Sequence, residues 1–69
     1  MEISFSEIQE GDLAFFDKNG KVTHVGILDG KGNIIHAAGF VREDRITPDG
    51  ILRKEDSEMT HHLFAIRRV

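Results

Sequence analysis

The amino-acid sequence predicts a mainly β fold, a small curled antiparallel sheet or half-barrel of about five strands, in a single domain spanning residues 1–69. Three observations support this prediction. Short runs rich in β-branched and aromatic residues recur along the chain, turn-forming residues separate these runs, and no strong helical segment is available to cover the sheet. A chain of 69 residues is also too short for a second domain.

The N-terminal part of the chain predicts a short helical turn followed by a hairpin. Ser6 is placed to cap a turn that runs into Glu10 and Gly11. Residues 13–16 are all apolar, which indicates a strand buried on both faces. The Asn19-Gly20 dipeptide then favours a tight turn, so this strand should pair with the strand that begins at residue 22.

A second hairpin is predicted at the centre of the chain, where β-rich runs at residues 22–28 and 33–38 flank Asp29-Gly30-Lys31-Gly32. If the loop comprises residues 29–31, Leu28 pairs with Gly32. His24 then lies directly opposite His36, on the same face of the sheet. A one-residue slip would separate the two imidazoles, so this prediction depends on a loop with an odd number of residues.

Gly26 lies two residues from His24 on the same predicted face of its strand. Glycine within a strand often marks a place where a ligand or another backbone comes close. We therefore expect Gly26 to be a substrate-binding position, and a β-bulge is the alternative interpretation.

The second half of the chain is less strongly patterned. Residues 40–46 are rich in charge and predict an edge strand facing water. Residues 47–50 fit a type I turn, residues 52–60 a loop or one short helix, and residues 63–69 a last strand. Apolar side chains fall on both faces of the sheet, which leaves one face without a partner in this sequence: Phe15, Phe16, Val25, Ile27, Ile34 and Ile35.

Composition argues against several classes of partner. The net charge is −3 and the nine Lys and Arg residues form no stripe, so nucleic acid is not an expected partner. No apolar run approaches the ~20 residues needed to span a bilayer, and residues 1–10 do not resemble a secretion signal. There is no cysteine, hence no disulfide and no thiol nucleophile.

The paired histidines carry the strongest chemical signal. One imidazole can act as a general base while the other fixes its tautomer and orientation, so His24 and His36 are the predicted catalytic residues. Two structural histidines are the alternative, because buried His is common when its ring nitrogens are satisfied. No Ser or Thr lies in a nucleophile motif such as G-x-S-x-G.

A metal site is the other possibility that the histidines raise. His24, His36 and either His61 or His62 could form a three-histidine zinc site with an open position. The chain lacks a compact ligand motif such as H-E-x-x-H. We therefore predict no metal and no cofactor, and interpret His61-His62 as the solvated start of the last strand.

Three ordered motifs resemble the C-terminal half of the NlpC-like cell-wall cysteine peptidases: G-D-L-A-F-F at residues 11–16, T-H-V-G-I at residues 23–27 and I-H-A at residues 35–37. The closing segment, residues 64–69, is similar to the last strand of the γ-D-glutamyl-diamino-acid endopeptidase branch. Glu10 stands where proline is frequent in the family. The resemblance implies the sheet half of a papain-like α+β domain, whose cysteine lies on an upstream helix in an Asp-Cys-Ser-Gly context.

The same resemblance implies roles and partners. His24 matches the family's general base, and His36 matches the polar residue that orients it. The implied substrate is a peptidoglycan stem peptide, in the cell envelope, periplasm or extracellular space. Without a cysteine, we expect this chain to be a partial domain, inactive alone, whose bare sheet face packs on the missing N-terminal half or on another copy of the chain. A non-catalytic barrel-type binding or interaction module is the alternative.

Overall fold

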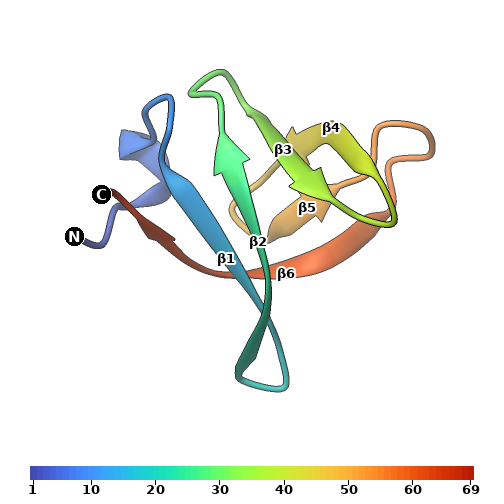
Figure 1. Ribbon diagram of the computed structural model, residues 1–69, viewed down its shortest axis with the longest axis horizontal. Coiled ribbons are helices and arrows are strands. Elements are labelled where there is room, and N and C mark those ends of the chain that lie inside the picture. Colours follow the sequence, from blue (N-terminus) through green and yellow to red (C-terminus); the bar gives the residue numbers. More distant parts are fainter.

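The computed structural model describes residues 1–69 as one closed antiparallel barrel (Figure 1). Each strand pairs with the next along the chain, and β6 returns to pair with β1 and close the barrel. The prediction of a mainly β fold is therefore confirmed, with six strands rather than about five and with complete closure. The strands are β1 (Leu13–Lys18), β2 (Lys21–Leu28), β3 (Asn33–Ala37), β4 (Val41–Ile46), β5 (Gly50–Leu52) and β6 (Met59–Arg67).

The β1–β2 hairpin forms as the sequence predicts. Asn19 and Gly20 are the two loop residues, and both have positive φ, at 56° and 81°. Two successive residues with positive φ match the right-handed twist of the flanking strands, which is why Asn-Gly is favoured there.

The helical turn is shorter than predicted and begins earlier. The 3₁₀ turn η1 spans Phe5–Glu7, and its N-cap is Ser4 rather than Ser6. The Ser4 hydroxyl donates to the Glu7 carboxylate at 2.7 Å. This bond joins two side chains and caps no backbone amide, and the turn begins after Ser4, so the predicted cap at Ser6 was wrong.

The two termini lie side by side, and the Arg68 amide donates to the Met1 carbonyl (Figure 1). Arg68 donates to both carboxylate oxygens of Asp12, at 2.8 and 2.9 Å, and Asp12 is almost fully buried. The paired hydrogen bonds from Arg68 hold the pKa of Asp12 below its ordinary value. This contact fixes the end of β6 against the loop that enters β1.

The core fills the inside of the barrel. Because the sheet curls into a barrel, side chains on its inner face pack against one another. The expectation that the strand at residues 13–16 is buried on both faces was wrong. Ala14 and Phe16 point inward, whereas Leu13 and Phe15 remain partly exposed. The buried apolar residues are Ile3, Ala14, Phe16, Leu28, Ile34, Ile46, Ile51 and Ile66.

The second half of the chain differs most from the prediction. β4 is not an edge strand, because it pairs with β3 on one side and β5 on the other. The expected turn at residues 47–50 forms, and the Gly50 amide donates to the Thr47 carbonyl at 3.2 Å. The short strand β5 that follows this turn was not predicted. Residues 53–58 form a turn rather than a helix, and β6 begins at Met59, four residues before the predicted strand. No helix in the fold has the length and apolar character needed to cross a membrane.

Candidate active site

The central hairpin places two histidines inside the barrel, in a register that differs from the predicted one. Leu28 pairs with Ile34, so the predicted pairing of Leu28 with Gly32 was wrong. The loop is wider because the Asp29 carboxylate accepts hydrogen bonds from the backbone amides of Lys31 and Asn33, at 2.7 and 3.0 Å. A side chain that caps its own loop in this way stabilises the longer connection.

The shift of two residues preserves the face on which the histidines lie, because side chains alternate with a period of two. His36 pairs with Gly26 rather than with His24, so the two histidines are diagonal neighbours. Their rings still meet, with His24 Nε2 2.9 Å from His36 Nδ1 and the ring planes nearly perpendicular, at 85°. The prediction that they share one face is confirmed, and the prediction that they lie directly opposite each other was wrong.

A buried carboxylate extends this pair on its inner side. Asp44, on β4, is 2% exposed and lies 2.8 Å from His36 Nε2. Burial raises the pKa of this carboxyl, but hydrogen bonds from Arg42, the Lys54 amide and His36 outweigh burial and lower the pKa to about 2. Asp44 is therefore ionised in the folded protein at neutral pH.

The hydrogen-bond chain from Asp44 to His24 assigns the tautomers. An ionised carboxylate only accepts, so the Nε2–H of His36 donates to Asp44 and leaves the Nδ1 lone pair of His36 free. That lone pair accepts the Nε2–H of His24. The remaining lone pair of His24, on Nδ1, is then available as a base. Burial, followed by the neighbouring His36 ring, keeps the pKa of His24 below 6.5, so the neutral form predominates at neutral pH.

A third histidine joins the cluster from β6. The His61 ring stacks on His24, with ring centroids 4.2 Å apart, and its Nδ1 lies 2.8 Å from the Thr60 hydroxyl. The interpretation of residues 61 and 62 as a solvated strand start was wrong for His61, because β6 begins earlier and turns this residue inward. It was right for His62, which is exposed and lies 2.6 Å from the Asp17 carboxylate.

Gly26 is explained by the packing of its neighbours. A β-carbon at this position would lie 2.5 Å from Ile34 Cδ1 and 3.1 Å from His36 Cβ. No bulge occurs at Gly26, which pairs regularly with Ala14 and His36; the register of β1 against β2 shifts instead between Phe16 and Asp17. The missing side chain makes room for the strand that carries His36, and a role for Gly26 in binding substrate stays a prediction.

The Gly26→Ala substitution should test this packing. We expect the free energy of unfolding to fall by about 1–3 kcal/mol, because the added methyl group overpacks a filled interior, and we expect the NMR signals of His36 to shift. Urea unfolding measures the first effect. Thr23→Ala, an exposed change on the same strand, is the matched control and should stay within about 0.5 kcal/mol. An unchanged stability for Gly26→Ala would contradict the packing explanation.

Two members of the cluster were missed at the sequence level. Asp44 shares its strand alternation with Ile46, and this inward parity was the available signal, but the surrounding charges favoured an edge strand instead. The sequence suggests His61 as one of two alternative metal ligands and, with His62, as the solvated start of the last strand. Asp44 reaches the site through the adjacent β3–β4 hairpin, whereas His61 reaches it through the pairing of β6 with β1, which is distant in the sequence.

Comparison with known proteins agrees with the resemblance. The sequence profile of the NlpC/P60 family matches residues 1–68. The chain is 50% identical over 50 residues to a probable endopeptidase p60 from Listeria seeligeri, a match that covers 71% of this chain and 10% of that protein. No solved structure matches. Because the family match extends over nearly the whole chain, this protein belongs to the NlpC/P60 family.

Proposed function

We propose that this chain supplies the histidine half of the active site of a cysteine peptidase that cleaves γ-D-glutamyl-diamino-acid bonds in peptidoglycan stem peptides. The observation that carries the proposal is the chain of hydrogen bonds from Asp44 through His36 to His24. It leaves one nitrogen, His24 Nδ1, free to accept a proton. Since the substrate is cell-wall material, we place this activity in the cell envelope or outside the cell.

In the proposed reaction, His24 Nδ1 takes the proton of the family's cysteine thiol, and the thiolate attacks the carbonyl carbon of the γ-glutamyl bond. The imidazolium of His24 then gives its proton to the departing amine of the diamino acid. In the second half, His24 accepts a proton from the water that attacks the thioester carbonyl, the carbon–sulfur bond breaks to release the glutamyl acid, and His24 returns the proton to the departing cysteine thiolate. His36 holds the ring of His24 in place throughout, and the Asp44 carboxylate holds His36.

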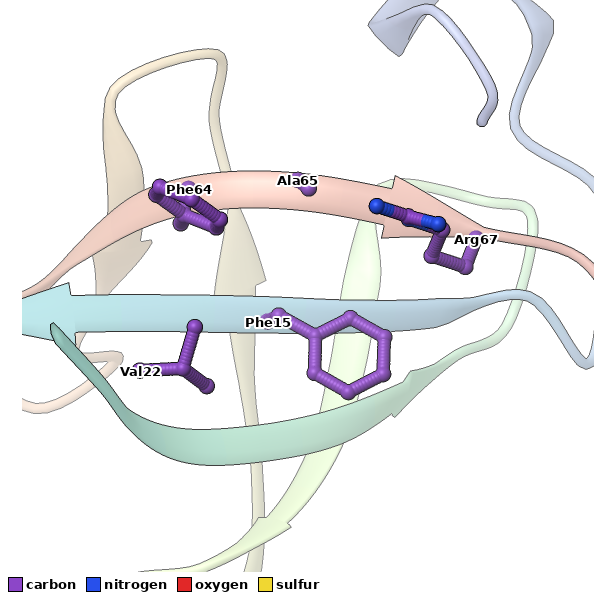
Figure 2. A pocket seen from close by; sticks show the side chains of 5 residues that line it. All are labelled: Phe15, Val22, Phe64, Ala65 and Arg67. Carbon is purple, nitrogen blue, oxygen red and sulfur yellow. The ribbon is translucent and has the colours of Figure 1, made fainter. Parts of the chain in front are cut away.

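The outer surface of the barrel fits a covering partner. Apolar side chains that are partly to largely exposed cover neighbouring strands from β6 to β4: Leu13, Phe15, Val22, Val25, Ile27, Ile35, Val41 and Phe64. A hollow of about 210 Å³ lies in this surface. Figure 2 shows three of the side chains that line it, Phe15, Val22 and Phe64, projecting from β1, β2 and β6. A second hollow, of about 490 Å³, is lined by residues that include Gly26 and His36.

We propose that the cysteine-bearing helical part of the domain occupies this outer surface. A free-standing barrel would leave these side chains in water. Covering them with a partner would stabilise the assembly by about 25 cal/mol for each Å² of apolar surface buried. The second hollow is lined in part by Gly26 and His36, so a helix packed there lies against the outer face of the strands that carry His24 and His36. A second copy of this chain on the same surface is the competing arrangement, and sedimentation of the isolated chain distinguishes the two.

The test joins this chain to the Asp-Cys-Ser-Gly helical segment of a family member. We expect no turnover of a γ-D-glutamyl-diamino-acid peptide by the chain alone, because it has no thiol, and measurable hydrolysis by the joined protein. Replacing the donor cysteine by alanine should abolish that hydrolysis. Hydrolysis by the pure chain alone would show that another group is the nucleophile, and a folded but inactive joined protein would reject the proposal.

A second candidate function is a non-catalytic binding module. Two observations favour it. The barrel closes its own core without a second half, and it contains no thiol nucleophile. Binding of the stem peptide by the isolated chain, together with an inactive joined protein, would support this candidate.

A further inference from the structure

Three imidazoles converge inside one end of the barrel. His24, His36 and His61 come from β2, β3 and β6, and one nitrogen of each lies within 4.8 Å of the other two. The closest pair, His24 Nε2 and His36 Nδ1, is 2.9 Å apart. Since the Nδ1 of His61 faces the Thr60 hydroxyl, its Nε2 is the nitrogen left without a hydrogen bond.

We propose that His24, His36 and His61 form a Zn²⁺ site of the three-histidine type, with a fourth position open to solvent. Zinc binds imidazole nitrogen at about 2.0–2.1 Å, which sets nitrogen atoms about 3.3 Å apart around a tetrahedral ion. The 2.9 Å contact has to widen only slightly to reach this spacing. One nitrogen of His61 lies within 4.8 Å of the other two. Because the His61 ring stacks on that of His24, it has to rotate out of this stack to direct its nitrogen at the same ion.

The surroundings of the cluster resemble those of established zinc sites. Histidines that bind metal usually donate their other N–H to a carboxylate or another polar group, which fixes the ring. Here the second nitrogen of His36 contacts Asp44, and that of His61 contacts Thr60. Imidazole nitrogen is a common ligand of Zn²⁺, whereas Ca²⁺ and Mg²⁺ prefer oxygen ligands.

Charge and access also permit an ion to bind. A polar hollow of about 160 Å³ adjoins His36 and His61 and opens the cluster to water. The positive charge of Arg42, which also lines this hollow, is balanced by Asp44 and Glu55. A cation at the cluster therefore meets no unpaired positive group on this side.

Zinc binding and the proposed base role exclude each other. Coordination through His24 Nε2 and His36 Nδ1 replaces the hydrogen bond between the two rings, and the proton of His24 moves from Nε2 to Nδ1. The nitrogen that would accept the thiol proton is then protonated. This consequence rests on the proposed function, whereas the zinc site itself does not.

The test titrates the metal-free chain with Zn²⁺ at pH 7 by isothermal calorimetry. We expect one equivalent to bind, and at least tenfold weaker binding for His61→Phe, which keeps a stacked ring but removes the ligand nitrogen. His62→Ala is the matched control: this neighbouring histidine is exposed and lies outside the cluster, so its removal should change the affinity less than twofold.

Two results would overturn the site. One is the absence of a one-to-one site in the wild-type chain, and the other is equal affinity in folded His61→Phe. Circular dichroism checks that each variant is folded, and His24→Ala provides a second ligand deletion, for which the same tenfold loss is expected. No step of this test needs a nucleophile, so its outcome is separate from that of the peptidase assay.

Discussion

In the protein that joins this chain to the cysteine-bearing helical segment, replacing His24 by alanine should lower kcat/KM about 10²-fold to 10⁴-fold, the range typical of a lost general base. The expected loss follows from the geometry of the cluster. His24 has its second nitrogen, Nδ1, free of a partner, and its first nitrogen is held by His36, which the ionised Asp44 holds in turn. His61 also has a free nitrogen, but its other nitrogen contacts only the Thr60 hydroxyl. Steady-state hydrolysis of a γ-D-glutamyl-diamino-acid peptide measures the effect.

The control for this experiment is His62→Ala. His62 is exposed on β6 and pairs with Asp17, away from the cluster, so its removal should leave kcat/KM within about twofold. Folding of both variants is compared by circular dichroism. Activity of His24→Ala within tenfold of the parent protein would reject His24 as the base, and an equal loss in His62→Ala would show that the effect is not specific to the cluster.

Replacing Asp44 by asparagine should lower the free energy of unfolding by about 3 kcal/mol, because breaking a buried ion pair leaves the partner charge uncompensated. The carboxylate is 2% exposed and contacts the side chains of Arg42 and His36 and the backbone amide of Lys54. For a domain of this length the total stability is only roughly 3–10 kcal/mol. A loss of this size is therefore a large fraction of the whole, and urea unfolding at pH 7 measures it.

Glu43→Gln on the same strand is the matched control. Its carboxylate is half-exposed and pairs only with Lys54, so its removal should cost no more than about 1 kcal/mol. Equal effects of the two substitutions would show that the burial of Asp44 contributes nothing to stability.

The effect of Asp44→Asn should also depend on pH. The folded-state pKa of Asp44, about 2, lies below the ordinary value of 3.8, so its stabilisation is complete above 3.8 and is lost as the pH falls through 2. In metal-free buffer, the difference between the wild type and Asp44→Asn should shrink from pH 5 to pH 2. A difference that stays constant over this range would contradict the assigned ionisation.

The sequence by itself determined the elements whose cause is local. The Asn19-Gly20 turn formed as expected, because the φ values of those two residues are set by their own chemistry. The inward parity of His24, Gly26 and Leu28 also followed from strand alternation alone. That parity was sufficient to place the two histidines on one face, even though the register that led to this inference was wrong by two residues.

Tertiary structure alone decided which partners surround those histidines. The alternation of β4 leaves open whether its charged residues face water, and only pairing with β3 and β5 puts Asp44 inside the barrel beside His36. His61 likewise reaches His24 only because β6 pairs with β1 and closes the barrel. Strand pairing between distant segments is set by the packing of the whole core rather than by the local pattern of either strand, so the complete cluster could not be read from the sequence.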